Sequence, residues 1–219
     1  MFTPYHDKLV AISSFRPLDA SAEVAANQLR AKRSWDQVFH RIYLFGDHDE
    51  RLASPNTVFV PCEQWPSIAL MALTASWQDE PTAILNADIV VSPSLRDLVN
   101  VGWKQQALAL TSKRAEFDPA TEDYDHAKVV DMGVDFFCAF PVVWQQVYKA
   151  IPAGFRQGHG LWDSWMLGFL NHRCVRRFFD ITALRPIFHP KHGDRLMPCQ
   201  IQVPPDCFYE QIGFPPALT

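Results

Sequence analysis

The sequence has 219 residues, enough for one domain that buries a large core without a disulfide or a structural metal. Hydrophobic residues make up 48 % and charged residues 20 %, which excludes wholesale disorder, and the net charge of −4 disfavours a protein that reads nucleic acid through its phosphates. The five cysteines form no CxxC pair, and no apolar run has the length of a membrane span. We therefore expect reduced thiols and a soluble, cytoplasmic protein with no membrane span.

Apolar, strand-like runs alternate with helical segments along the chain. The predicted strands cover residues 9–15, 41–45, 57–60, 82–91, 106–111, 133–140 and 177–182. The predicted helices cover residues 18–35, 66–77, 94–103, 142–150 and 162–172. Residues 114–131 are charged and turn-prone and are predicted to be a surface loop, and a proline-rich tail follows the last strand. This order predicts an α/β fold with a mostly parallel central sheet and helices on both faces, which binds ligands at the carboxyl ends of its strands.

Polar residues stand at the predicted ends of the first two strands. Ser13, Ser14 and Arg16 end the first strand, and Asp47 follows the second. These residues are candidates for nucleotide binding, although serine and aspartate also serve simply to make turns. No GxGxxG or GxxxxGK[ST] motif follows the first strand, so neither a dinucleotide fingerprint nor a P-loop is predicted.

The triplet Asn86-Ala87-Asp88 interrupts the apolar run of residues 82–91. A carboxylate in such a run is costly to bury unless it is paired, hydrogen-bonded or bound to a metal. Mg²⁺ and Mn²⁺ prefer carboxylate and phosphate oxygens and take few of them from the protein. Asp88 is therefore a candidate metal ligand, and a simple turn at the end of the strand is the alternative.

Further candidates lie nearer the C-terminus. Asp163 stands at the start of a predicted helix, where it is either a helix-capping carboxylate or a general base. His189 and His192 occur in the tail between prolines that hold the chain extended, which makes them candidate metal ligands. Trp162 and Trp165 are predicted to belong to the core.

The chain carries NADI after an apolar strand, GVDFFCAF at residues 133–140, GHGLWDSW at residues 158–165, FFDIT at residues 178–182 and IFHPKHGD at residues 187–194. Together these segments resemble the glycosyltransferase-like proteins of the GT-A fold, and more closely a bacterial and phage group within them. The resemblance covers most of residues 8–194. It implies a single GT-A-like, Rossmann-like domain over residues 1–194, with residues 195–219 as a C-terminal extension packed on it.

The resemblance also implies a nucleotide-sugar donor, which we expect to be a UDP-sugar. Asp88 would meet its diphosphate through Mn²⁺ or Mg²⁺, a tail histidine would complete the coordination, and Asp135 and Asp163 would face the sugar and the acceptor. Two positions depart from the group's pattern. Asn86 replaces the first acidic residue of the DxD motif, and His159 stands where an arginine is expected. Lys113, Arg114 and Lys191 are the candidates for supplying the missing positive charge to the leaving group.

These residues predict a metal-dependent glycosyltransferase in which Asp163 activates an acceptor hydroxyl. The acceptor remains open among a glycan, a protein and a modified nucleobase. One alternative is a nucleotidyltransferase, which would require a phosphate-gripping loop richer in glycine and lysine than SSFRPLD at residues 13–19. The other is a non-catalytic module that binds a nucleotide-sugar or a glycan, an interpretation that Asn86 and His159 favour.

Overall fold

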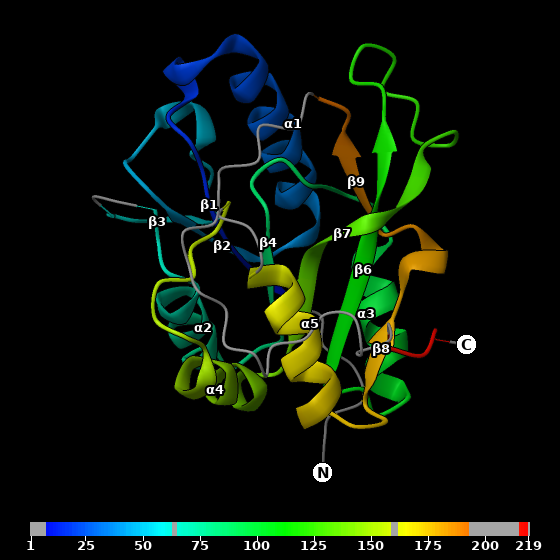
Figure 1. The fold of residues 1–219 in the computed structure, drawn as a ribbon. Coiled ribbons are helices and arrows are strands. Elements are labelled where there is room, and N and C mark those ends of the chain that lie inside the picture. Colours follow the sequence, from blue (N-terminus) through cyan, green and yellow to red (C-terminus); the bar gives the residue numbers. More distant parts are fainter. Residues whose placement is uncertain (1–7, 63–64, 159–161, 193–214, 219) are drawn as a thin grey trace.

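The computed structural model describes residues 8–62, 65–158, 162–192 and 215–218 (Figure 1). The strands, in chain order, are β1 (Val10–Ser14), β2 (Arg41–Phe45), β3 (Thr57–Val60), β4 (Thr82–Leu85), β5 (Val90–Val91), β6 (Ala109–Phe117), β7 (Lys128–Ala139), β8 (Phe178–Asp180) and β9 (Ile187–Pro190). The helices are α1 (Ala22–Val38), α2 (Ile68–Ser76), α3 (Leu95–Lys104), α4 (Pro141–Ala150) and α5 (Trp162–Arg173).

All of these strands join one sheet, in the order β3-β2-β1-β4-β7-β6-β9-β5, with β8 beside β6. The strands β3, β2, β1 and β4 run parallel to one another. Strand β7 runs antiparallel to both of its neighbours, β4 and β6, while β8 and β9 run parallel to β6. Parallel pairings therefore outnumber antiparallel ones, and the predicted mostly parallel sheet is confirmed.

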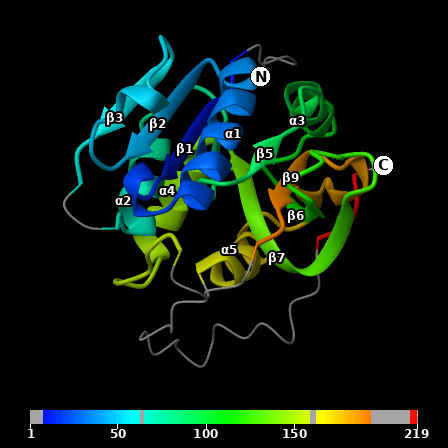
Figure 2. The same ribbon diagram turned by 90° about the horizontal axis from the view of Figure 1, so that it is seen from above.

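Helices cover both faces of the sheet (Figures 1 and 2). On one face, α1 and α3 contribute Trp35, Leu95 and Trp103 to a core with Ala11 and Leu85 of the sheet. On the other face, α2, α4 and α5 form a second core, in which Met71, Trp144 and Met166 pack against Val10 and Ile12. This arrangement follows from strands that are apolar on both sides and therefore need a helical layer on each.

Helix starts agree with the local chemistry of the sequence. The Ser21 side chain accepts a hydrogen bond of 3.1 Å from the amide of Val24 at the start of α1, and Ser67 does the same for Leu70 in α2. Pro141 occupies the first turn of α4, where its missing N–H costs nothing.

Two predictions made from the sequence are wrong. The loop expected at residues 114–131 is shorter, because β6 extends to Phe117 and β7 begins at Lys128. Ala115 and Phe117 are buried in a small core with Val90, whereas Arg114 and Glu116 alternate with them on the other side of the strand. This mixture of charged and apolar residues made the strand resemble a loop.

The second error concerns the tail. Residues 177–182 were predicted to be the last strand, but β9 follows them, pairs with β6 and β5, and carries His189 at a buried position. Proline is tolerated at its end, where Lys191 rather than Pro190 donates the next hydrogen bond, to the carbonyl of Phe117.

Part of the predicted C-terminal extension lies against the domain. Ala217 bridges to Asp180 of β8, and the amide of Leu218 donates a 2.9 Å hydrogen bond to the carbonyl of Asp180. Leu218 is buried in the α1-side core. The boundary between residues 194 and 195 falls outside the described residues and stays a prediction. In the described part of the chain, no helix has both the length and the apolar character needed to cross a bilayer.

Candidate metal centre and active site

Asp88 lies in a tight turn directly after the carboxyl end of β4. The amide of Ile89 donates a 3.2 Å hydrogen bond to the carbonyl of Asn86 and closes this turn before β5 resumes the sheet. The Trp35 indole of α1 donates a 2.6 Å hydrogen bond to the carbonyl of Ile89. The turn is thus held by hydrogen bonds on both sides. The Asp88 carboxylate lies at the carboxyl ends of the strands, where ligands bind in folds of this type.

Two histidines approach the same carboxylate oxygen. The Nε2 atom of His189 lies 3.5 Å from Asp88 Oδ2, and the Nε2 atom of His192 lies 3.3 Å from it. The donor atoms of these three residues all lie within 4.8 Å of one another. His189 reaches this position from β9, while His192 follows that strand by two residues. The structure therefore brings together all three residues that the sequence analysis proposed as metal ligands.

The surroundings of the three side chains fit a divalent cation. Burial by itself would raise the pKa of Asp88, but the hydrogen bonds and charges of the two histidines outweigh it and hold this pKa well below its ordinary range. The carboxylate is therefore ionised and available as a ligand. The Nδ1 atom of His189 is buried and has no hydrogen-bond partner among the described residues. One carboxylate and two imidazoles form a donor set that suits Mn²⁺ better than Mg²⁺, which prefers oxygen ligands throughout.

A second polar group lies beside the turn and centres on Asp135. This residue is the extra residue of a β-bulge, since β7 advances from Phe136 to Val134 while β6 advances by a single residue. Its backbone carbonyl accepts a 3.2 Å hydrogen bond from the amide of Asn86 instead, and its carboxylate accepts another from the Asn86 side chain. The other carboxylate oxygen accepts a 2.9 Å hydrogen bond from Arg114.

Arg114 is a cation held within this group of carboxylates. Burial would lower its pKa, but the charges of Asp135, Glu116 and Asp88 raise the pKa above its ordinary value. Its close approach depends on Gly133, which has a φ of 103°, and a Cβ atom there would lie 3.1 Å from the guanidinium carbon. The structure thus places the predicted residues Asn86, Asp135 and Arg114 in one hydrogen-bonded network, which adjoins Asp88.

Ser13 and Ser14 are buried at the end of β1, and their hydroxyls have partners within the protein. Ser13 donates a 2.7 Å hydrogen bond to the carbonyl of Leu85. Ser14 donates 2.7 Å hydrogen bonds from both its amide and its hydroxyl to Oε1 of Gln157, whose amide nitrogen donates in turn to the carbonyl of Leu85 at 2.6 Å. Gln157 therefore links the ends of β1 and β4 through hydrogen bonds. This role was not predicted, because a single glutamine in a glycine-rich turn matches no known motif.

Arg16 and Asp47 are exposed beyond the ends of β1 and β2. The Arg16 guanidinium lies 5.4 Å from the centre of the Trp65 ring, and its backbone amide donates a 2.8 Å hydrogen bond to Gln28. Trp65 was not singled out from the sequence. Asp47 lies in the bend after β2, and no contact among the described residues joins it to the network around Asp88.

Asp163 stands in the first turn of α5 and is half-buried. Burial, with the negative charge of Asp135 as a second cause, raises its pKa to about 6. Its Oδ1 atom accepts a 2.8 Å hydrogen bond from the amide of Ser164. Asp163 and Asp135 are thus close enough to interact electrostatically. His159 lies outside the described residues, and Trp162 and Trp165 belong to the core, as predicted.

No protein-family model and no curated protein matches the sequence. Among solved structures, the chain is similar to residues 1–349 of S. aureus TarS, determined in complex with UDP-GlcNAc, with 12 % identity and a TM-score of 0.52. The match covers 93 % of this chain and 64 % of that 1–349 chain. UDP-glucose pyrophosphorylase complexed with UDP-glucose matches with 12 % identity and a TM-score of 0.47, over 86 % of this chain and 92 % of that one. A Bacillus anthracis protein described as a glucose-1-phosphate thymidylyltransferase matches with 9 % identity and a TM-score of 0.48, over 80 % and 87 %.

These similarities concern the fold. The likeness to TarS, together with the sheet order and the helical layers, defines a single mixed α/β domain of the GT-A-like, Rossmann-like class. The predicted fold class is therefore confirmed. The other two scores lie below 0.5 and add nothing to this assignment.

Proposed function

We propose that the chain is a metal-dependent glycosyltransferase that moves a sugar from a nucleotide-sugar to a hydroxyl acceptor. The observation that carries this proposal is the convergence of His189 and His192 on Asp88, at the carboxyl end of β4 in a GT-A-like sheet. Asp88, His189 and His192 would hold Mn²⁺, with Mg²⁺ as the weaker fit, and the donor would be a UDP-sugar. When bound, the cation supplies positive charge for the diphosphate that leaves with the nucleotide.

The residues of the chain divide the remaining work. Arg114 adds a fixed positive charge beside the metal ligands, which stabilises the departing diphosphate in the way that a second cation would. Asp135 and Asn86 hold each other and line the place expected for the sugar. Ser13, Ser14, Arg16 and Asp47 remain proposed contacts of the nucleotide, in which the two serines would act through backbone geometry because their hydroxyls already bond within the protein.

Asp163 is proposed as the general base. In its ionised form it would accept the proton of the acceptor hydroxyl as that oxygen attacks the sugar, and a pKa of about 6 leaves it ionised at neutral pH while keeping it a stronger base than an ordinary aspartate. Asp135 is the second candidate for this role. The acceptor itself would be a glycan, a protein or a modified nucleobase.

A calorimetric titration with UDP and Mn²⁺ tests the metal site. We expect Mn²⁺-dependent UDP binding in the wild type, loss of binding in Asp88→Ala, and retention of binding in Asp123→Ala, which removes an exposed carboxylate from the 118–127 loop. Equal affinities in the wild type and Asp88→Ala would refute the proposed metal site.

One observation favours a non-catalytic binding module as the second candidate. Asn86 and Arg114 both donate hydrogen bonds to the Asp135 carboxylate, so both oxygens of that carboxylate are already occupied within the protein. Release of UDP from a panel of UDP-sugars separates the two functions, because a module would bind a nucleotide-sugar without ever splitting it. Release of pyrophosphate from a nucleoside triphosphate and a sugar 1-phosphate would instead establish the nucleotidyltransferase alternative.

A further inference from the structure

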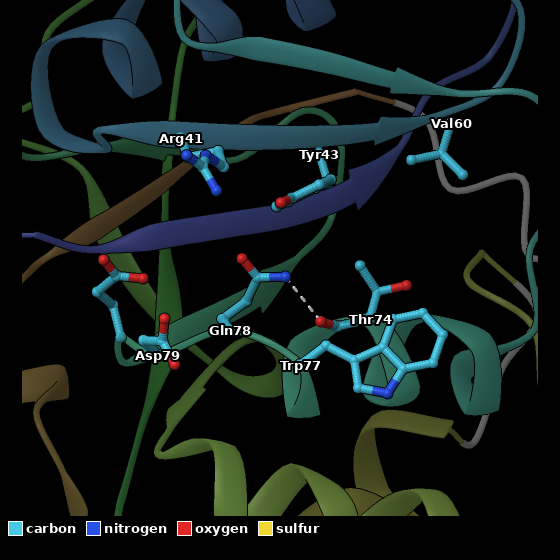
Figure 3. Close-up of a pocket in the computed structure, with 8 residues that line it drawn as sticks. Arg41, Tyr43, Val60, Thr74, Trp77, Gln78 and Asp79 are labelled. Carbon is cyan, nitrogen blue, oxygen red and sulfur yellow. Dashed lines mark hydrogen bonds between the residues drawn. The ribbon is translucent and has the colours of Figure 1, made fainter.

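A pocket lies on the α2 side of the sheet, between the edge strands and the end of α2 (Figure 3). Its volume is about 540 Å³, within the range of cavities that accept small ligands. In Figure 3, Arg41, Tyr43 and Val60 form a row along β2 and β3, opposite Thr74, Trp77, Gln78 and Asp79 at the end of α2. Glu80 completes the lining. We call this the Trp77 pocket.

The Trp77 pocket is separate from the Asp88 site. In the sheet order, β1, β4, β7 and β6 lie between β2, which carries Arg41 and Tyr43, and β9, which carries His189. Arg41 also stands at the amino end of its strand, whereas Asp88 follows the carboxyl end of β4. A ligand in the Trp77 pocket therefore does not share residues with the proposed reaction.

An exposed aromatic face dominates one wall of the pocket. Trp77 is 70 % exposed, more than any other large hydrophobic residue in the described part of the chain. Tyr43 contributes a second, partly buried ring from β2. Flat aromatic faces of this kind stack on the C–H faces of pyranose rings, and a ligand that covered Trp77 would gain the apolar burial that the fold itself does not provide.

Neutral and charged polar groups surround this aromatic face. The lining offers the Tyr43 and Thr74 hydroxyls, the Gln78 amide, the Arg41 guanidinium and two carboxylates, which are the donors and acceptors that sugar hydroxyls require. Some of them are held in place by the protein. The amide nitrogen of Gln78 donates a 2.9 Å hydrogen bond to the carbonyl of Thr74, and the Glu80 carboxylate lies 3.7 Å from His40 Nε2. Side chains that are already ordered lose less entropy when a ligand binds.

The charge of the lining selects among ligand classes. Of the eight described residues that line the pocket, Arg41 is the cation, and Asp79 and Glu80 are its opposing carboxylates. Two carboxylates against one guanidinium repel phosphates and nucleotides, while the polar rim does not suit a purely apolar ligand. We propose that the Trp77 pocket is a binding site for a neutral saccharide unit, stacked on Trp77 and hydrogen-bonded by Arg41, Gln78 and Asp79.

The experiment titrates the full-length chain with neutral disaccharides, namely maltose, cellobiose, mannobiose and N,N′-diacetylchitobiose, at up to about 10 mM. The indole N–H signals of the seven tryptophans are followed by NMR, and Trp77→Ala identifies the signal of Trp77 by its disappearance. We expect at least one disaccharide to shift the Trp77 signal. Ligand-observed saturation transfer then measures the affinity, which should fall about tenfold or more in Trp77→Ala, as the loss of a stacking contact implies.

Two variants serve as controls. Tyr148→Ala removes another exposed aromatic ring, from α4, and should leave saccharide binding unchanged. Asp88→Ala should also leave it unchanged, so failure of the metal site and failure of this proposal are distinguishable. The proposal is overturned if none of the four disaccharides binds, if the affinity is unchanged in Trp77→Ala, or if UMP rather than a saccharide shifts the Trp77 signal.

Discussion

The two halves of the sheet differ in what their strands carry. In the parallel half, made of β3, β2, β1 and β4, β1 and β4 are buried along their whole length. In the mixed half, made of β7, β6, β9, β5 and β8, the strands carry Arg114, Asp135 and His189 at buried or half-buried positions. The first half is thus a scaffold that is stabilised by apolar burial. The second half buries charged side chains at a cost in stability, as functional sites commonly do.

The irregularities of the backbone follow the same division. Register shifts occur in the pairing of β6 with β7, and Gly133 adopts a φ of 103° beside Arg114. The pairings of β1, β2, β3 and β4 with one another run without such shifts. A bulge re-aims side chains, and here it directs Asp135 towards Asn86 and Arg114. Mutations in the two halves should therefore separate stability from function.

The largest effect is expected from Trp144→Ala, at the face of the parallel half. Trp144 is fully buried on α4, and its indole donates a 2.9 Å hydrogen bond to the carbonyl of Thr82. Its removal should lower the free energy of unfolding by about 3–5 kcal/mol, measured by urea denaturation. Trp77→Ala, which removes an exposed indole, is the matched control and should cost no more than about 0.5 kcal/mol. Similar losses in the two variants would contradict the assignment of this face as the stabilising core.

Asp163→Asn should lower turnover rather than stability. As the proposed general base, Asp163 acts on the acceptor proton, so its loss should lower turnover by roughly 10²-fold while UDP affinity stays near that of the wild type. Asparagine also caps helices, so a fold that needed only a cap would keep its activity. The wild-type rate should rise as the pH increases through about 6, because the base must be ionised, and this rise should be absent in Asp163→Asn. Full activity of the folded variant would move the search for the base to Asp135.

His189→Ala and His192→Ala should each weaken Mn²⁺-dependent UDP binding by about ten- to hundredfold, because each removes one proposed ligand while Asp88 remains. Isothermal titration with UDP and Mn²⁺ measures both losses. His126→Ala is the control, since His126 is exposed in the 118–127 loop. An unchanged affinity in both histidine variants would show that Asp88 binds the metal without them.

The sequence predicts the parallel half well because each strand there is a short apolar run followed by a helix. Ile42 and Leu44 indicate β2, and Pro66 predicts the start of α2 to within two residues. The same signals are missing in β9, because a histidine and a proline within four residues do not predict a paired strand. Strand β9 is buried because it pairs with β6 and β5, and this pairing is a tertiary contact that the local sequence does not reveal.

The candidate site shows the same limit. Asp88 stands out in the sequence because a carboxylate interrupts an apolar run. Its contact with His192, 104 residues away, was proposed only from the resemblance to GT-A proteins. The role of Gln157 could not be proposed from the sequence. Its hydrogen bonds reach the ends of the neighbouring strands β1 and β4, which are far from Gln157 along the chain, so no local pattern reveals them.

The smallest expected effect is the loss of stability that the buried Asp163 carboxylate causes at neutral pH. Burial and the charge of Asp135 raise the pKa of Asp163 from its ordinary value of 3.8 to about 6, so the folded protein disfavours the ionised form. The folded state then binds the proton more tightly than the unfolded state. This stabilising contribution is present in full below about pH 4 and is lost as the pH rises to about 6.

At neutral pH the buried charge of Asp163 therefore lowers the free energy of unfolding of the wild type, and Asp163→Asn lacks this loss. Thermal unfolding between pH 4 and pH 7 should show the variant gaining on the wild type as the pH rises, by about 1–2 kcal/mol at pH 7 after allowance for the half-exposed carboxylate. Asp180→Ala is a suitable comparison, because Asp180 Oδ1 accepts hydrogen bonds from the amide and the hydroxyl of Thr182, and their loss should destabilise the protein instead. A pH-independent difference between Asp163→Asn and the wild type would mean that Asp163 titrates as an ordinary carboxylate, and the general-base assignment would lose its electrostatic support.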